Sequence, residues 1–583
     1  MIKIPYGISD FSNMPLEQYH YIDRTNYIER LENRGEKAIH YVRPRRFGKS
    51  LFISTLHHYY GLEYKDQFKE LFGNYYIGQH PTQRANTYLV LSFDFSGINT
   101  KDAKNTYRDF MDNVLNGILT FLTAYDTFFS QEDIDKIEQI QSPQGMLKRL
   151  WTIVKQKAKG QKVYVLVDEY DHFTNELLSL NFSLFKKIVS QNGWVRKFYE
   201  VLKRGNSTGI VDRIFLTGVS PVTLDSLTSG YNISSNFSID LNFCELMGFT
   251  EKEVIATLKG IEVPANQLDK MVSDLRLWYN GYLFHEAGEQ RIYNPDMVLY
   301  FAKHYATYKQ YPKDLLDENI ASDYGKMDKL FHLNDARIAN MELLRTILDE
   351  GRISAVLTKK YSFEVPWTKD NFISLLYYMG IMTIQKSEGL DDLVFQMPNF
   401  VIRQLYFKFF NQVLLQEAQL TPAIVDIESK VKAVAQKNDW QPLLSLMENI
   451  LSQLGREDKA HFNEVSLKTL FASFFYQVAY YNIFSELEVR KRNNQKGRVD
   501  LLLTRRPPFS PTYQFVFELK YLRTKQQSSL ETTKKEAMGQ LAEYIQQDDA
   551  LTTLDHLKAY VLIFVGNEGH IFEVNEQDRK GII

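Results

Sequence analysis

Residues 41–52 read YVRPRRFGKSLF, and this stretch decides the interpretation of the first half of the chain. Gly48, Lys49 and Ser50 follow an apolar strand pattern and precede a helical pattern, which is the context of a phosphate-binding loop. In such a loop Lys49 would reach the β and γ phosphates of a nucleotide, and Ser50 would hold Mg²⁺. Gly48 would let backbone N–H groups approach the anion at a helix N-terminus. A phosphate loop normally begins with glycine, whereas this one begins with Arg43, and G-K-S alone is a weak signal.

A second signal is VYVLVDEYD at residues 163–171. Its apolar run places Asp168 and Glu169 at the C-terminal end of a buried strand, where open α/β sheets bind ligands. Asp168 would order Mg²⁺ through water, and Glu169 would polarise the attacking water as general base. A strand end with two solvated acids is the alternative. Combined with the upstream G-K-S loop, the pattern favours an ATPase.

A third strand, RIFLTGVSP at residues 213–221, ends near Thr217 and Ser220. These polar groups could sense the γ phosphate from an intervening strand, and ordinary turn chemistry is an equal alternative. The sequence does not fix which cation would stabilise the charge of the transition state. The candidates are Arg45, Arg46, Arg196, Lys203 and Arg213.

The hydrophobic pattern predicts three regions. Residues 1–245 alternate helical patterns with apolar strands, which indicates an α/β domain with a parallel sheet. Residues 246–460 are mainly helical, with a small winged-helix unit expected around 340–400. Residues 461–583 follow the order α-β-β-β-α-β. We therefore expect an α/β protein of three domains.

Composition limits the classes of protein that this chain can represent. With 583 residues it exceeds the size of one hydrophobic core, so two to four domains are expected. The formal net charge of −2 requires a local basic patch for any polyanion partner. One cysteine, Cys244, excludes an intrachain disulfide and a thiolate zinc cluster. No signal peptide or long apolar run occurs, so we predict a cytoplasmic protein with no membrane segment.

A second charged set lies in the last predicted domain. Asp500 ends GRVD, and Glu518 and Lys520 lie on the next strand in FELK. Alternate residues of a strand share a face, so adjacent strands would bring these side chains together. Two carboxylates can bind Mg²⁺, or Mn²⁺ as an alternative, which activates water for phosphodiester cleavage, and the lysine can orient that water. Glu464, on the preceding helix, is a further candidate metal ligand. Surface strands often carry E-x-K, so this pattern is weak by itself.

Basic residues surround this second set and could neutralise the phosphates of a nucleic acid. Solvated hairpin tips are the alternative explanation for them. They are Arg490, Lys491, Arg492, Lys496, Arg498, Arg505, Arg506, Arg523, Lys525, Lys534 and Lys535.

Eight ordered motifs carry a resemblance to a known family. They are PYGISDF (5–11), YIDRT (21–25), RPRRFGKSLF (43–52), VDEYD (167–171), FLTGVS (215–220), GFTEKEV (248–254), WYNGYLF (278–284) and YNP (293–295). In this order they resemble the predicted AAA-ATPase-like family of bacteria, a P-loop group of STAND/AAA type, whose phosphate loop typically starts with the same Arg-Pro-Arg-Arg. The resemblance implies ATP as cofactor and places Asp23 and Thr25 near the nucleotide.

Residues 460–575 resemble the PD-(D/E)XK nuclease superfamily, whose core has the α-β-β-β-α-β order. Val499 stands where the superfamily name has proline. The resemblance places Glu464, Asp500, Glu518 and Lys520 in an active site, with Gln540 as a less certain helper. It implies nucleic acid as partner, with DNA favoured over RNA, and a homo-oligomer is compatible with it.

The leading hypothesis is an ATPase coupled to a Mg²⁺-dependent nuclease, in defence against foreign DNA or in mobile-element biology. One alternative is an ATPase signalling switch whose last domain binds nucleic acid without cutting it. Another is a DNA-reading winged-helix regulator. Residues 371–384, NFISLLYYMGIMTI, argue against this regulator, since they are apolar throughout and typical of a core helix.

Overall fold

The computed structural model describes residues 2–190, 192–227, 230–318, 320–321, 337–361, 367–388, 392–417, 426–454, 462–490 and 496–575. The chain forms two compact units. The first comprises Met1–Tyr308, Asp317–Asn340 and Arg352–Asn399, and the second comprises Lys309–Leu316, Met341–Gly351 and Phe400–Ile583. Residues 246–460 fall partly in each unit, and the three predicted domains stay a prediction.

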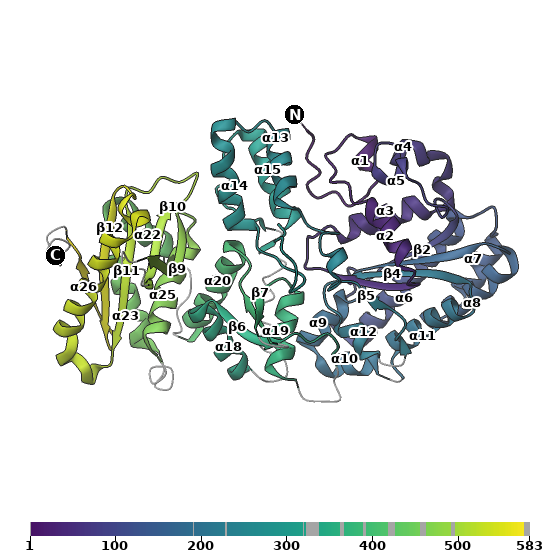
Figure 1. Cartoon of the computed structure of the whole chain (residues 1–583). Coiled ribbons are helices and arrows are strands. Elements are labelled where there is room, and N and C mark those ends of the chain that lie inside the picture. The colour runs from purple at the N-terminus through teal and green to yellow at the C-terminus, as the bar shows by residue number, and fades with distance from the viewer. Residues whose placement is uncertain are drawn as a thin grey trace. The chain divides into compact units, whose positions relative to one another are not determined.

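A five-stranded parallel sheet forms the centre of the first unit (Figure 1). Its strand order is β2-β3-β4-β1-β5. The strands are β1 (Ala38–Val42), β2 (Tyr88–Asp94), β3 (Lys162–Asp168), β4 (Val211–Gly218) and β5 (Ser235–Asn236). Nearly every residue of β1 to β4 is buried, as the apolar runs predicted. The predicted parallel α/β sheet is confirmed, and β4 lies between the strands that carry the two main motifs.

Helices cover both faces of this sheet. In Figure 1, α2 (Asn26–Arg34) and α3 (Lys49–Tyr60) lie above it, and α6 (Ala103–Ala124) and α11 (Trp194–Ser207) lie below it. Because all strands are parallel, the loops that follow β1 and β3 leave the same edge of the sheet. The phosphate loop and the acidic strand end therefore lie at one edge.

The rest of the first unit contains helices and a small sheet. Its helices α13 (Glu251–Gly260), α14 (Ala265–Tyr279) and α15 (Pro295–Tyr308) precede an antiparallel sheet with the order β6-β8-β7. The sheet consists of β6 (Arg352–Val356), β7 (Thr383–Glu388) and β8 (Asp392–Gln396), with α19 (Lys369–Tyr378) between β6 and β7. We call β6, α19, β7 and β8 the small-sheet module. Every residue of α19 from Phe372 to Tyr378 is buried, as expected for a core helix, and a winged-helix identity stays a prediction.

The second unit contains a mixed sheet of five strands in the order β13-β12-β11-β10-β9. The strands are β9 (Tyr481–Arg490), β10 (Lys496–Arg505), β11 (Gln514–Leu522), β12 (Leu557–Val565) and β13 (Glu568–Glu573). Pairing is antiparallel except between β11 and β12. Helix α25 (Glu464–Gln477) precedes these strands and α26 (Leu530–Gln547) connects β11 to β12, so the predicted α-β-β-β-α-β order is confirmed. Strand β13 was not predicted.

Further helices complete the second unit, and apolar side chains fill its core. The helices are α20 (Phe400–Glu417), α22 (Ile427–Lys437) and α23 (Gln441–Gln453). Val499, Leu541 and Val561 belong to a buried cluster that joins α26 to the sheet. Trp440 packs edge-on against Phe515 and Phe517 of β11.

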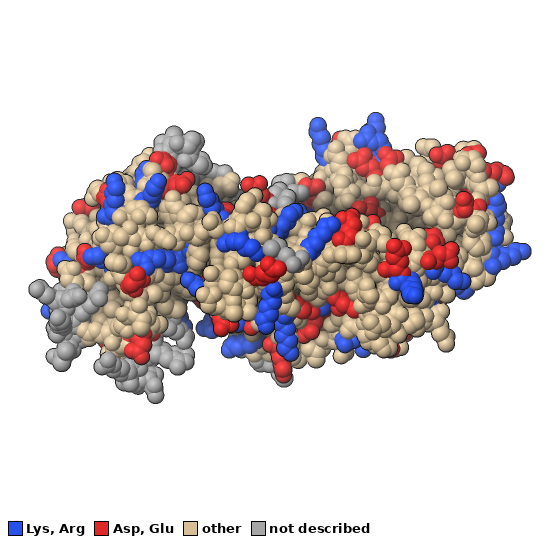
Figure 2. Space-filling view, turned by 90° about the horizontal axis from the view of Figure 1, so that it is seen from above, with Lys and Arg blue, Asp and Glu red and all other residues tan. Residues whose placement is uncertain are grey.

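The surface carries charges of both signs. On the face shown in Figure 2, lysine and arginine side chains are interspersed with aspartate and glutamate. Across the described residues, we find no helix with the length and apolar character needed to cross a bilayer.

Candidate active sites

The phosphate loop has the backbone shape that its sequence requires. Gly48 has φ 89° and caps the N-terminus of α3, and Arg46 also has a positive φ of 67°. Only glycine adopts the left-handed region at little cost, so Gly48 lets the loop turn sharply into the helix. Lys49 is buried, and its Nζ donates to the backbone oxygens of Arg43 at 3.2 Å and Pro44 at 3.1 Å. Its ammonium thus satisfies the loop's own carbonyls.

Asp168 and Ser50 lie together at the edge of the sheet. Asp168 is buried and hydrogen-bonded to the Ser50 side chain. Burial, together with the neighbouring charges of Glu169 and Asp94, raises the pKa of Asp168 to about 6, against the opposing effects of Ser50 and Lys49. Asp94 ends β2 directly opposite Asp168 in the parallel register. The sequence analysis missed Asp94, although its strand pattern ended in the same way as VDEYD.

Glu169 has a strained backbone. Its φ of 51° lies in the left-handed region, which is uncommon for residues other than glycine and is often found at functional sites. The His172 N–H donates to the Glu169 carbonyl oxygen at 3.1 Å, which holds this turn at the start of α9 (His172–Leu180). Glu169 and His172 both line the cavity described next.

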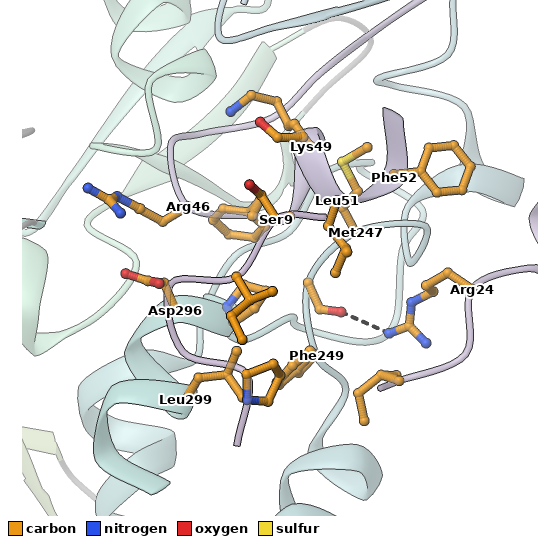
Figure 3. Close-up of a pocket in the computed structure, with 18 of the residues that line it drawn as sticks. Ser9, Arg24, Arg46, Lys49, Leu51, Phe52, Met247, Phe249, Asp296 and Leu299 are labelled. Atoms are coloured by element: carbon orange, nitrogen blue, oxygen red, sulfur yellow. Dashed lines mark hydrogen bonds between the residues drawn. The ribbon is translucent and has the colours of Figure 1, made fainter. Parts of the chain in front are cut away.

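A cavity of about 470 Å³ extends from the phosphate loop (Figure 3). This volume is within the usual range for small-molecule and cofactor pockets. Arg45, Arg46 and Lys49 are cations of its lining. Phe249 and Leu299 belong to its apolar lining and lie across the pocket from Lys49 in Figure 3. The lining thus offers both cations and apolar side chains, which suit the phosphates and the base of a nucleotide.

Distant motifs meet around this cavity. Arg24 of YIDRT donates to the Gly248 carbonyl oxygen at 2.8 Å (Figure 3). It also donates to Glu253 Oε2 at 2.8 Å, so it joins GFTEKEV. Asn294 of YNP donates to the Arg45 carbonyl oxygen at 3.4 Å. Its Oδ1 accepts the Asp296 N–H at 3.0 Å at the start of α15. These motifs therefore build the walls of the pocket.

Three predicted nucleotide ligands do not line the cavity. Asp23 accepts hydrogen bonds from the backbone N–H groups of Thr25 and Tyr76, both at 2.8 Å. Thr25 is fully buried and accepts the Ile77 N–H at 3.1 Å. Thr217 is also fully buried and donates to the Tyr41 carbonyl oxygen at 2.9 Å. Their side chains fix neighbouring backbone, and a nucleotide contact for them stays a prediction.

Three predicted cations also lie outside the lining of the cavity. Arg196 pairs with Glu200 at 3.2 Å, Arg213 donates to the Glu36 carbonyl oxygen at 3.3 Å, and Lys203 donates to Asn232 at 2.6 Å. Of the five candidates named from the sequence, the structure brings Arg45 and Arg46 to the pocket.

Asp171, the last residue of VDEYD, is a structural residue that the sequence analysis missed. It is fully buried, and its carboxylate accepts the N–H groups of Val219 at 3.0 Å and Ser220 at 2.6 Å. Asn175 donates to the same carboxylate. Burial raises the pKa of Asp171. This carboxylate joins the end of β3 to the end of β4, next to Glu169.

The second predicted site is assembled in the second unit. Lys520 Nζ lies 3.1 Å from Glu464 Oε1 and 3.0 Å from Glu518 Oε1. Asp500 Oδ2 accepts the Leu519 N–H at 2.7 Å, so the carboxylate of β10 is held against β11. Helix α25 and two adjacent strands thus bring four predicted residues together, as the sequence indicated.

Buried charge dominates this site. Burial, together with the Asp500 charge, raises the pKa of Glu518 to about 7, and Lys520 opposes both. Burial also raises the pKa of Asp500, although the Leu519 N–H, Lys520 and Lys468 oppose it. Glu518 is 2% exposed, and its Oε2 is buried without a hydrogen-bond partner. A buried carboxylate oxygen without a partner is costly, and a divalent cation would satisfy it.

The donor set suits a hard cation. Asp500 and Glu518 offer carboxylate oxygens, and Glu464 offers another from the start of α25. Among the described residues, no three His, Cys, Asp or Glu side chains form a group arranged to hold a metal. A metal bound here would therefore have fewer than three side-chain ligands, which Asp500 and Glu518 would supply. Other oxygens would complete its coordination.

Other residues of this domain have mixed roles. Lys468 is buried one helical turn beyond Glu464, and the sequence analysis missed it. Gln540 donates to the Tyr544 hydroxyl at 2.8 Å. Arg505 pairs with Asp555, and Arg506 is buried and donates to the Ala479 carbonyl oxygen, so both serve the fold. Two further basic residues of the predicted patch, Lys491 and Arg492, lie outside the described residues.

Comparison with known proteins gives two family matches, one over each candidate active site. The chain carries an AAA-ATPase-like domain. Residues 5–228 match the model of the family described as predicted AAA-ATPase. Residues 462–574 match the PD-(D/E)XK nuclease superfamily, so a nuclease-superfamily domain follows the AAA-ATPase-like domain.

One curated relative is an uncharacterized protein in the vnfD 5' region of Azotobacter chroococcum mcd 1. It is 31% identical over 315 residues, and the match covers 52% of this chain and 52% of the relative. The chain thus matches about half the length of that relative, and the name of the relative states no activity.

The AAA-ATPase-like domain match includes the loop at Lys49 and the acids at Asp168 and Glu169. It ends before GFTEKEV and YNP, whose residues nevertheless complete the walls of the pocket. The nuclease-superfamily match contains Glu464, Asp500, Glu518 and Lys520. An AAA-ATPase-like domain implies nucleotide binding, and nucleases of the PD-(D/E)XK superfamily usually use a divalent metal.

Proposed function

We propose that this protein binds and hydrolyses ATP with Mg²⁺ and that this activity controls a metal-dependent nuclease acting on nucleic acid. One observation carries the nuclease assignment: the buried, unpartnered Glu518 Oε2 lies in a cluster with Asp500 and Lys520. Such a carboxylate is suited to a cation that neutralises the charge developing on a phosphodiester.

Each residue of the nucleotide site has a proposed role. Lys49 would exchange the carbonyl oxygens of Arg43 and Pro44 for phosphate oxygens. Ser50 and Asp168 would hold Mg²⁺, which neutralises phosphate charge when bound. Glu169 would accept a proton from the attacking water. The cations Arg45 and Arg46 line the same pocket and would meet the charge of the phosphates.

In the nuclease-superfamily domain the residues have distinct tasks. Asp500 and Glu518 would hold the cation, which supplies activated water. Lys520, held by Glu464 and Glu518, would orient that water or stabilise negative charge. Glu464 fixes the lysine and is a further ligand candidate. DNA is the favoured substrate, and a role in defence or mobile-element biology is part of the proposal.

The test incubates the purified protein with single- and double-stranded DNA and RNA, with Mg²⁺ or Mn²⁺, and with or without ATP. We expect cleavage by the wild type, no cleavage by Glu518→Ala, and loss of ATP hydrolysis in Lys49→Ala. The matched controls are Glu568→Ala, an exposed acid of the same sheet, and Lys37→Ala, an exposed lysine before β1. Cleavage that survives in Glu518→Ala would remove the nuclease assignment. If the wild type binds nucleic acid and cuts none of these substrates, the domain is a binding module instead.

A further inference from the structure

The phosphate loop contacts residues 281–284 of the WYNGYLF motif, which neither proposed activity explains. The Phe47 ring lies edge-on to Tyr282 at 5.0 Å and to Phe284 at 5.5 Å between centroids. The Arg43 guanidinium stacks over Phe284 at 3.9 Å. We call these four side chains the aromatic block. All four are buried, with Phe284 the most exposed at 5%.

No side chain of the aromatic block can move without displacing the others. Arg43 donates to the carbonyl oxygens of Val42 at 3.0 Å and Ser238 at 2.7 Å, so its guanidinium is fixed at the end of β1. Close-packed interiors transmit displacement, because few voids are available to absorb it. A change in the backbone between Arg43 and Phe47 must therefore be met by Tyr282 and Phe284.

The structure shows which contact a nucleotide would change. Lys49 Nζ now bonds to the carbonyl oxygens of Arg43 and Pro44. Phosphate oxygens would compete for the same ammonium donors, and these two carbonyls would lose their partner. A ligand shifts a conformational equilibrium only through contacts that differ between the two states, and this exchange is such a difference. It occurs in the segment that carries Arg43 and Phe47.

The far side of the block is bonded to the small-sheet module. The Leu283 N–H donates to Thr383 Oγ1 of β7 at 2.8 Å, and the Tyr377 hydroxyl of α19 donates to the Phe284 carbonyl oxygen at 3.1 Å. Arg291 donates to the Gly281 carbonyl oxygen at 2.6 Å and to the Ile384 carbonyl oxygen at 3.3 Å. Residues 281–284 are thus held by the phosphate loop on one side and by the module on the other.

We propose that nucleotide binding at the phosphate loop is transmitted through the aromatic block to the small-sheet module. This inference rests on the proposed nucleotide binding and names how that site is coupled. Pro398 and Asn399 follow the last strand of the module and contact the same motif. A Cβ on Gly281 would meet the Pro398 carbonyl oxygen at 2.0 Å, and Asn399 donates to the Asn280 carbonyl oxygen at 3.0 Å.

The chain continues from the small-sheet module into the second compact unit. Asn399 is followed directly by α20, whose first residue, Phe400, belongs to the second compact unit. The small-sheet module is thus in the last segment of the first unit, and every residue from Phe400 onward belongs to the unit that carries Asp500 and Glu518.

Hydrogen exchange of the full-length protein tests the coupling, with and without a slowly hydrolysed ATP analogue plus Mg²⁺. In the wild type we expect exchange of the amides at 281–284 and 381–387 to slow at least threefold when the analogue binds. Binding itself is measured separately by equilibrium dialysis. If the analogue binds and exchange at 381–387 does not change, the coupling is wrong and nucleotide binding stands. If nothing binds, the nucleotide site and the coupling both fail.

Two variants interrupt the path at different points. Phe284→Leu removes the ring that touches both Phe47 and Arg43, and we expect binding of the analogue to persist while the response at 381–387 is lost. Thr383→Val removes the acceptor of the Leu283 N–H, and the response is expected to persist at 281–284 and to disappear at 381–387. Phe121→Leu, a buried ring of α6 outside the block, is the control and should respond like the wild type. A wild-type response in Phe284→Leu would overturn the proposal.

Discussion

At the scale of single residues, both candidate sites use buried carboxylates whose ionisation is unfavourable. Asp168 and Glu518 have raised pKa values, and burial is the main cause for each. Strongly shifted carboxylates in a cluster with a cationic partner are typical of functional sites. The pH dependence of stability and of binding therefore tests these residues without knowledge of the substrate.

Replacement of Glu518 by glutamine is expected to stabilise the protein at alkaline pH. The folded state binds the Glu518 proton more tightly than the unfolded state, since the pKa rises from 4.5 to about 7. This carboxyl therefore destabilises the fold progressively as the pH rises through that interval. Glu518→Gln should raise the free energy of unfolding at pH 8 by on the order of 1 to 3 kcal/mol, and by much less at pH 5.5. Thermal melts at both pH values measure this, with the exposed Glu568→Gln as control. An equal change at both pH values would contradict it.

Binding of Mg²⁺ with nucleotide should weaken in mild acid because Asp168 becomes protonated. With a pKa of about 6 in the free protein, the ionised fraction falls from about nine-tenths at pH 7 to about one-tenth at pH 5. The affinity of the wild type should therefore fall about tenfold more than that of Asp168→Asn, in which this position does not titrate. Equilibrium dialysis is done with both proteins. The ionisation of the nucleotide affects both affinities equally, so it does not affect the comparison. Parallel pH profiles would show that Asp168 does not act at this step.

Replacement of Glu169 by glutamine should separate hydrolysis from binding. A general base typically contributes about 10² to 10⁴ in rate, and glutamine preserves the size of the side chain without accepting a proton at neutral pH. Glu169→Gln should therefore bind the ATP analogue as the wild type does while the steady-state hydrolysis rate falls at least 100-fold. Full hydrolysis by this variant would assign the base to another residue.

At the scale of elements, the ends of β3 and β4 are joined by buried polar contacts at which space is limited. A Cβ on Gly218 would meet Asp171 Oδ1 at 2.1 Å, in the carboxylate that holds Val219 and Ser220. Gly218 is needed at this position for its small size.

Gly218→Ala should destabilise the first unit. The added methyl group must displace the Asp171 carboxylate and loosen its hydrogen bonds, and overpacking of this kind typically costs about 1 to 3 kcal/mol. Thermal unfolding followed by circular dichroism should show a lowered transition, and ATP hydrolysis should fall because Glu169 adjoins this junction. An unchanged melting temperature would mean that Asp171 can move freely.

Much of this element-level structure could be predicted from the sequence because it is local. Apolar runs located β1 to β4, and strand patterns in the last domain located β9, β10, β11 and β12. Pairs of residues brought together by tertiary folding could not be found in this way. The pairing of Asp94 with Asp168 depends on sheet order, and the burial of Lys468 depends on which face of α25 packs inward.

The predicted nucleotide ligands that do not line the cavity have a related explanation. Asp23 and Thr25 adjoin the pocket residues Ile22 and Arg24 in the sequence, and Thr217 lies near the end of a buried strand. Each of the three forms hydrogen bonds with backbone groups. The local sequence pattern shows that these residues are polar, but the fold determines which groups they form hydrogen bonds with. Two-residue β5 and edge strand β13 were missed because they are short or partly exposed.

At the scale of the whole molecule, nucleotide should stabilise one unit selectively. Two compact units with separate cores are expected to unfold in separate steps, and a ligand stabilises only the folded form that binds it. At a concentration 100 times its dissociation constant, the ATP analogue should add about 2.7 kcal/mol to the unfolding free energy of the first unit. Differential scanning calorimetry should show one transition rising and the other unchanged, and Lys49→Ala should abolish the shift. One transition that shifts as a whole would mean that the units unfold together.

The discontinuous composition of the units bears on how the chain matures during synthesis. Segments 309–316 and 341–351 belong to the second unit, although they precede the small-sheet module in the sequence. On the ribosome these two segments emerge early and wait for Phe400 and later residues before they can take their places. The nucleotide-binding unit becomes complete once Asn399 has emerged, while Asp500 and Glu518 are still unsynthesised. Because domains generally fold in order of synthesis, the part proposed to bind ATP is in place before the part proposed to cut nucleic acid exists.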